Sequence, residues 1–115
     1  MIKAVFMGTP KFAADILKAL IDDELCDVVA AYTMPDAVRG RGKKLVPSDV
    51  KKVAIDNKIP VVELKSFKSV SDVENLKAYS PDFICVAAFG ALLPKSVLDI
   101  PKYECLNVHA SLLPK

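Results

Sequence analysis

The chain has 115 residues, 52% hydrophobic and 26% charged, which is the balance of one folded domain and not of a disordered segment. Its longest apolar runs, about seven residues around Phe83–Phe89, are too short to span a membrane, and the N-terminus lacks the layout of a secretion signal. The net charge is only +2, but residues 39–52 carry a local +5, which indicates either a solvated loop or a contact for a polyanion. Three widely spaced cysteines exclude CxxC redox and zinc motifs, and we expect reduced, buried thiols in a cytoplasmic protein.

The first half of the chain predicts two strands, two helices and a long loop. Apolar runs at Ile2–Met7 and Val28–Thr33 indicate buried strands. Between them, Thr9 is expected to cap a helix that ends at about residue 21. Pro35–Pro47 is expected to be a loop, and Ser48 to cap the second helix. The expected inner faces carry Phe12, Ile16, Ala19 and Leu20 in the first helix and Val50, Val53 and Ala54 in the second.

The second half continues the alternation. A short strand is expected at residues 60–62, followed by a helix that opens with a capping box at Ser71 and Glu74 and turns Val73 and Leu76 inward. Pro81 should close this helix. The most apolar run is expected to be a central strand, and a short helix and a last strand should follow it. These three elements are predicted at Phe83–Ala88, Pro94–Leu98 and Cys105–His109.

Near-continuous apolar strands that alternate with helices favour an α/β fold with a doubly wound, mainly parallel sheet and helices on both faces. Ligands of such sheets bind beyond the carboxyl ends of the strands, where the strand order reverses. Gly8-Thr9 and Phe89-Gly90 both leave strands at that edge, so we expect the site between them. Neither GxGxxG nor GxxxxGK[ST] is present, so the usual loops for dinucleotides and nucleoside triphosphates are missing.

His109, the only histidine, ends the last predicted strand two residues after Asn107. Because strand side chains alternate, both point the same way. They form either a hydrogen-bonded strand end or a reacting centre that donates to an oxyanion and moves a proton. Two apolar loops, 91–94 and 111–114, either pack simply or line a slot for a flat organic ligand. No set of three convergent metal ligands follows from the sequence, and a serine hydrolase using Ser111 lacks the G-x-S-x-G motif.

Four stretches together resemble the methionyl-tRNA formyltransferase family: MGTPKFA at 7–13, PDAVRGRGKKLVPS at 35–48, AAFGALLP at 87–94 and NVHASLLPK at 107–115. The similarity runs along the whole chain, and MGTPxFA combined with GRGKKL is its most specific part. This family transfers a formyl group from 10-formyltetrahydrofolate to the amino group of methionyl-tRNA. The resemblance implies a Rossmann-like formyltransferase fold and an enzyme of translation initiation, with folate and initiator methionyl-tRNA as partners. It further implies a monomer that needs no metal or membrane.

The resemblance also assigns residues. Asn107 and His109 match the family's catalytic asparagine and histidine at the formyl carbonyl. The matching folate-binding positions are Phe89, Gly90, Ala91, Leu92, Leu93, Ser111, Leu112, Leu113 and Pro114. Arg41 matches the basic loop that approaches the tRNA acceptor end, and the other cations expected to bind tRNA are Arg39, Lys43 and Lys44.

The chain departs from the family in what it lacks. It ends before the family's catalytic aspartate, before the rest of the sheet and before the C-terminal tRNA-binding domain. We therefore expect residues 1–115 to be the N-terminal portion of the catalytic domain, incomplete at the C-terminus of the sheet and inactive alone. Ala37 and Val38 replace a common Arg-Pro, and Asp49 replaces a common proline.

Two other functions stay open at this point. One is a folate-dependent formyltransferase that acts on a small amine, with the basic loop serving another phosphate. The other is a non-enzymatic α/β module that binds a ligand. The sequence that follows Lys115 would separate these alternatives.

Overall fold

The sheet organises the chain and is built around its first strand. A computed structural model describes residues 1–38 and 45–108. In chain order, the elements are β1 (Ile2–Gly8), α1 (Lys11–Asp22), β2 (Cys26–Thr33), β3 (Ala37–Val38), β4 (Leu45–Val46), α2 (Asp49–Asp56), β5 (Val61–Glu63), α3 (Val70–Ala78), β6 (Phe83–Ala87), α4 (Lys95–Leu98) and β7 (Glu104–Val108). In the described part of the chain, five strands form the sheet in the order β5-β2-β1-β6-β7, and every neighbouring pair is parallel.

This strand order confirms the predicted doubly wound α/β fold. The chain first moves outward from β1 to β2 and β5, and then returns to the other side of β1 with β6 and β7. The apolar run predicted to be central is β6, which lies inside the sheet between β1 and β7, while β1 occupies the middle. The point at which the strand order reverses therefore lies between β1 and β6, which are themselves parallel.

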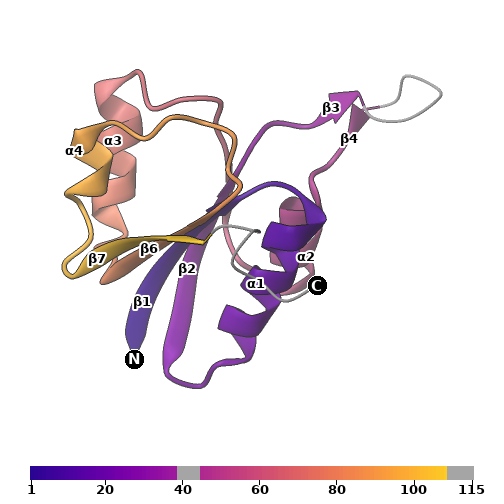
Figure 1. Ribbon diagram of the computed structural model, residues 1–115, viewed down its shortest axis with the longest axis horizontal. Coiled ribbons are helices and arrows are strands. Elements are labelled where there is room, and N and C mark those ends of the chain that lie inside the picture. The colour runs from indigo at the N-terminus through magenta and orange to yellow at the C-terminus, as the bar shows by residue number, and fades with distance from the viewer. Residues whose placement is uncertain (39–44, 109–115) are drawn as a thin grey trace.

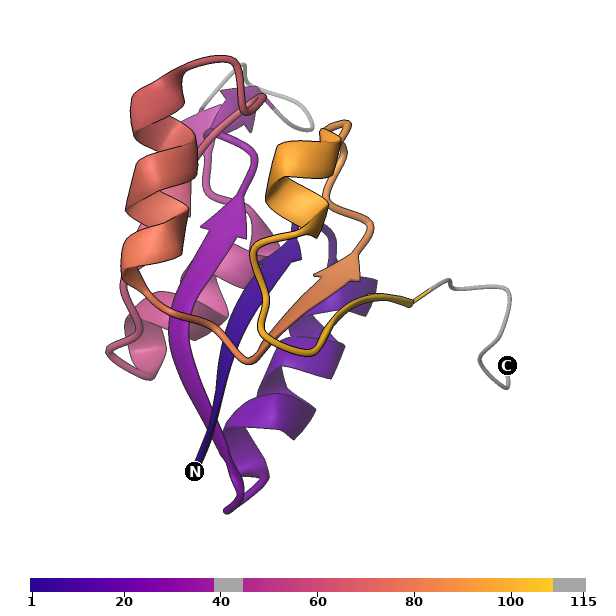
Figure 2. The same cartoon turned by 90° about the vertical axis from the view of Figure 1, so that its left-hand side faces the viewer.

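Helices cover both faces of the sheet (Figures 1 and 2): α1 and α2 lie on one face, and α3 and α4 on the other. The strand β1 supplies both cores, because Phe6 packs with α1 and α2 whereas Val5 and Met7 pack with α3 and α4. A strand that is buried on both faces has no polar side, which explains the continuous apolar run in its sequence.

The inner face of α1 differs in part from the prediction. Ala13, Ala14 and Leu17 are its buried residues, Ala19 is exposed, and the larger predicted residues are half-buried at the margins. The helix approaches the sheet closely at its start, since a Cβ atom on Gly8 would lie 2.6 Å from Ala13 Cβ. Such an approach requires small residues at the centre of the contact.

Only one of the three predicted caps is confirmed. Ser48 Oγ accepts from Lys51 N at 3.0 Å and caps α2. The cap of α3 is Ser69, whose Oγ accepts from Asp72 N at 3.1 Å, so the prediction of Ser71 was wrong by two residues. The N-cap residue of α1 is Pro10, whose side chain cannot form a cap hydrogen bond, and the hydroxyl of Thr9 is engaged elsewhere.

The predicted loop at 35–47 contains secondary structure. β3 and β4 pair antiparallel, with Ala37 opposite Val46 and Val38 opposite Leu45. This hairpin stem projects beyond the two helical layers (Figure 1). Strands of two residues carry no hydrophobic periodicity, so the sequence contains no sign of them. In the described residues, no helix has the length and apolarity needed to cross a bilayer.

Candidate functional site

The carboxyl edge of the sheet gathers the segments expected to form a site. Gly8 ends β1, Met34 follows β2, and Phe89 and Gly90 follow β6. In an open α/β sheet, this edge is where ligands bind when the strand order reverses. The expected juxtaposition of 8–9 with 89–90 is confirmed by a direct hydrogen bond between the two segments.

Thr9 ties the loops of this edge together. Its Oγ1 donates to the carbonyl of Phe89 at 2.8 Å and accepts from the backbone N–H of Met34 at 3.3 Å. Its own carbonyl accepts from Val50 N at 3.4 Å. We call Thr9, Met34 and Phe89 the threonine junction. Sequence analysis missed this role, since a threonine before a helix is typical of a cap.

The segment 89–93, expected to bind folate, changes direction sharply after β6. Ala88 and Gly90 both have positive φ, at 50° and 93°. Phe89 is only 2% exposed and belongs to the core, whereas the side chain of Leu92 is 92% exposed. Ala91 and Leu93 are half-buried against the same core. The side chain of Phe89 is thus held in the core, and Leu92 is the apolar side chain that the segment presents outward.

Gly90 also meets Met34. A Cβ atom at Gly90 would lie 3.4 Å from Cγ of Met34 and 3.8 Å from its sulfur. These are ordinary contact distances, so space alone would admit a Cβ; glycine is needed here because an L side chain rarely adopts a φ of +93°.

Asn107 lies in β7 opposite Val86, one residue before the strand ends, and it is exposed. In parallel strands the carboxyl ends share one edge, so Asn107 stands at the edge that also carries the threonine junction. The other predicted catalytic residue, His109, lies outside the described residues. So do the remaining predicted folate- and tRNA-binding positions, namely Ser111, Leu112, Leu113, Pro114, Arg39, Arg41, Lys43 and Lys44.

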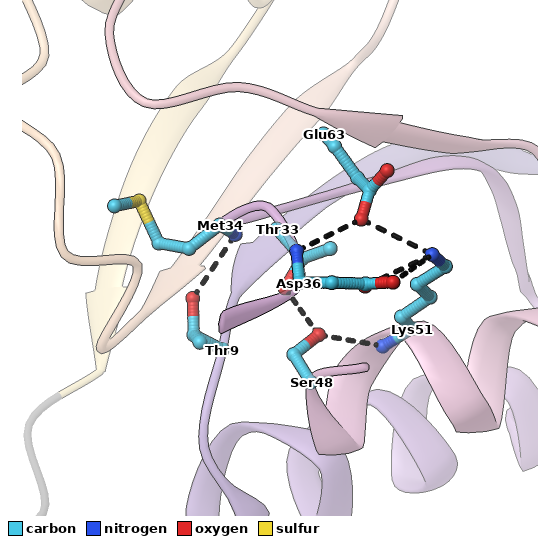
Figure 3. A network of polar contacts seen from close by, with 7 residues as sticks. All are labelled: Thr9, Thr33, Met34, Asp36, Ser48, Lys51 and Glu63. Carbon is cyan, nitrogen blue, oxygen red and sulfur yellow. Dashed lines mark hydrogen bonds and ion pairs between the residues drawn. The ribbon is translucent and has the colours of Figure 1, made fainter. Parts of the chain in front are cut away.

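A second polar cluster lies at the base of the hairpin (Figure 3). Lys51 Nζ contacts Asp36 Oδ1 at 2.9 Å, Asp36 Oδ2 at 3.1 Å and Glu63 Oε1 at 3.1 Å. We call Asp36, Lys51 and Glu63 the lysine clamp. These hydrogen bonds, first to Asp36 and then to Glu63, raise the pKa of the Lys51 amine. The sequence had placed Lys51 among the cations of residues 39–52, but its two acidic partners lie outside that segment.

A buried pair of hydroxyls lies beneath the clamp. Thr33 Oγ1 and Ser48 Oγ are 2.6 Å apart, and both side chains are fully buried. Ser48 thereby joins the carboxyl end of β2 to the start of α2, while it also caps that helix. Thr33 and Ser48 thus satisfy each other's buried hydroxyls, which offsets the cost of burying them.

The cysteines give the site no nucleophile. All three thiols are free, and Cys85 is buried, whereas Cys26 and Cys105 are only half-buried, against the expectation. Burial raises the pKa of Cys85 to about 11, so its thiol is neutral at physiological pH. Within residues 1–38 and 45–108, no three metal-ligating side chains gather at one point.

Residues 2–115 match the family described as formyl transferase, so the chain belongs to the formyl transferase family. Its relatives include the methionyl-tRNA formyltransferase of Clostridium perfringens (strain 13 / Type A), which is 55% identical over 114 residues, covering 98% of this chain and 36% of that protein. The methionyl-tRNA formyltransferase of Hahella chejuensis is 49% identical over 114 residues, covering 99% of this chain and 36% of that protein. The chain thus spans about a third of the length of these curated relatives.

A solved structure shares the fold. Glycinamide ribonucleotide transformylase 1 from Geobacillus kaustophilus matches with a TM-score of 0.62 and 18% identity, covering 100% of this chain and 63% of that chain. This likeness supports the Rossmann-like α/β architecture that the strand order already shows.

Proposed function

We propose that this chain is the N-terminal portion of the catalytic domain of a methionyl-tRNA formyltransferase. The whole enzyme would transfer a formyl group from 10-formyltetrahydrofolate to the amino group of initiator methionyl-tRNA, as a cytoplasmic monomer that needs no metal. The observation that carries the proposal is 55% identity, along nearly the entire chain, to relatives that bear this name.

Asn107 and His109 would stabilise the transition state. Attack of the methionyl amine on the formyl carbon forms a new C–N bond and places negative charge on the carbonyl oxygen. The bond from that carbon to the folate nitrogen then breaks, and the amine gives up a proton. Positioned donors lower the energy of the oxyanion, and an imidazole can carry the amine's proton to the departing folate nitrogen. The exposed position of Asn107 near the end of β7 supports its part in this role.

The folate would bind along 89–93 and 111–114. The threonine junction supports this assignment, because it fixes the first residue of 89–93 against two other loops. Leu92, exposed and apolar, offers a surface for a flat ring.

The tRNA would be held by Arg39, Arg41, Lys43 and Lys44, which follow β3 and precede β4 in the chain. The support is that the hairpin stem projects outward, beyond the layers of the fold (Figure 1), where a large substrate has access. Phosphate contacts by such cations release counterions, so affinity would fall as salt rises.

A chimeric enzyme tests the proposal. In this chimera, residues 1–115 replace the matching 114 residues of the Clostridium perfringens relative. We expect it to formylate methionyl-tRNA, whereas the 115-residue chain alone should lack turnover at an enzyme-like rate. A folded chimera that formylates glycinamide ribonucleotide instead would favour a small-amine enzyme. A folded chimera that binds folate but transfers nothing would contradict the proposal.

A further inference from the structure

We propose that Lys51 is a positioning residue, which orients the β3–β4 hairpin by joining Asp36 to Glu63 and does not itself contact the nucleic acid. This inference rests on the proposed function for its effect on tRNA. The part that concerns the orientation of the hairpin does not depend on the proposed function.

Three segments of the chain converge on the Lys51 ammonium. Lys51 lies in the first turn of α2, Asp36 directly precedes β3, and Glu63 ends β5. The ammonium bonds both oxygens of Asp36 and one oxygen of Glu63, all within 3.1 Å (Figure 3). The same Glu63 oxygen also accepts from Asp36 N at 3.2 Å. Lys51 thus joins its own helix, α2, to the end of β5 and to Asp36. Asp36 is the partner that leads directly into the hairpin.

The other leg of the stem is also held at its base. β4 ends at Val46, and two residues later Ser48 is locked to Thr33 by the buried 2.6 Å hydrogen bond. Ser48 also accepts from the backbone N–H of Lys51. Residue 51 therefore fixes one leg through its side chain and the other through its backbone.

The hairpin needs such an anchor because it cannot orient itself. Its described strands are two residues long and form a sheet separate from the main one. A two-stranded hairpin is marginal on its own even when its strands are longer. The position of the stem relative to the sheet must therefore come from the contacts at its base.

The charges at the clamp argue against a phosphate contact. The single positive charge of Lys51 faces two carboxylates, and its side chain is only 20% exposed. A phosphate could bond this ammonium only by displacing a carboxylate that already holds it. Lys52, the next residue, is exposed and makes no ion pair within the described ranges, so it provides a control of equal charge.

The test compares Lys51→Met, Lys51→Arg and Lys52→Met in the 115-residue chain. Hydrogen exchange is measured at the backbone amides of Ala37, Val38, Leu45 and Val46. Affinity is measured by fluorescence anisotropy with a labelled RNA hairpin that copies a tRNA acceptor stem, at several salt concentrations. Since both Met variants remove one positive charge, a difference between them reports on position and not on net charge.

We expect Lys51→Met to speed exchange in the stem and to weaken RNA binding about fivefold more than Lys52→Met does, with an unchanged salt slope. Lys51→Arg should restore both, since it keeps the charge and offers a forked donor. If the stem exchanges as in the original chain and the salt slope falls by about one in Lys51→Met alone, Lys51 contacts a phosphate and the inference is wrong.

Two results separate this inference from the proposed function. If the unaltered chain does not bind the RNA, the tRNA role of this region fails, while the exchange data still decide whether Lys51 holds the stem. If Lys51→Met does not fold, Glu63→Gln replaces it, because that change removes one of the two acidic partners at an exposed position. Unaltered exchange in Glu63→Gln would then overturn the inference.

Discussion

The threonine junction and the lysine clamp hold neighbouring parts of the same edge by different means. At the junction, one short neutral side chain bonds two backbone groups directly. At the clamp, one long charged side chain spans two carboxylates near solvent. Neutral hydrogen bonds at a partly buried site are insensitive to salt, whereas ion pairs near the surface are screened. The proposed folate side is thus held by contacts that salt does not screen, and the proposed tRNA side by contacts that solvent conditions can change.

The largest effect should come from the two residues proposed to act on the formyl carbonyl. We expect His109→Ala and Asn107→Ala, made in the chimera, each to lower kcat by about 10²–10³-fold, because each removes a donor to the oxyanion. Folate binding, measured by titration, should change little. If a variant keeps normal turnover, the substituted residue has no part in the mechanism. If turnover and folate affinity fall equally, the residue binds folate and does not act in the transition state.

The junction itself can be broken by Thr9→Val, which keeps the shape and removes the hydroxyl. Because Met34 N–H and the Phe89 carbonyl both lose a partner, unfolding should become easier by about 1–2 kcal/mol. Thr9→Ser should recover most of this loss. Denaturant titrations at low and high salt measure it. If high salt abolished the difference in stability between the original chain and the Thr9→Val variant, the contrast between a neutral and an ionic region would be wrong.

On the other side of the comparison, Arg41→Ala in the chimera should raise the KM for methionyl-tRNA about tenfold through loss of one charge-assisted contact. Folate binding should stay nearly unchanged. The KM of Arg41→Lys should lie between those of the original chimera and of Arg41→Ala, since lysine keeps the charge but cannot copy a forked contact. Parallel loss of folate binding would indicate a folding role, and no loss at all would leave a solvated loop as the better interpretation.

The smallest expected effect is a pH dependence of the hairpin stem, caused by deprotonation of Lys51 in the lysine clamp. The pKa of Lys51 is raised in the folded chain, so its stabilising contribution is complete below the unfolded value of about 10.4. That contribution is lost as pH rises through the higher folded value. Carbonyl carbon shifts of Ala37 and Val46 should therefore stay constant from neutral pH and move toward disordered values only in strong alkali. In Lys51→Arg they should stay constant throughout, and a shift there at the same pH would assign the change to another group.

Sequence reasoning worked where a single physical cause dominates. Ile2–Gly8 and Phe83–Ala87 are strands buried on two faces, and continuous apolar runs predict such strands directly. The alternation of strands and helices then restricted the topology, and the topology placed 8–9 beside 89–90. Asn107 was expected near the end of its strand and is found there.

It failed where local chemistry competes with distant partners. Thr9 has the sequence context of a cap, but Phe89, eighty residues away, takes its hydroxyl. Lys51 looked like one more cation in a basic run until Asp36 and Glu63 were placed around it. The predicted cap of α3, Ser71, and the observed cap, Ser69, differ by two residues, which is within the usual uncertainty of a helix end.

The position of β1 has a consequence for how the polypeptide is made. β1 is synthesised before the other strands of the sheet but pairs on one side with β2 and on the other with β6, whose residue Phe83 lies opposite Ala4. After β2 leaves the ribosome, more than fifty further residues must follow before β6 can close the second edge. At ordinary rates of translation this takes roughly 3–11 s, during which an apolar strand keeps an unpaired edge. During that interval the open edge of β1 is an aggregation risk for the nascent chain and a surface that a chaperone could cover.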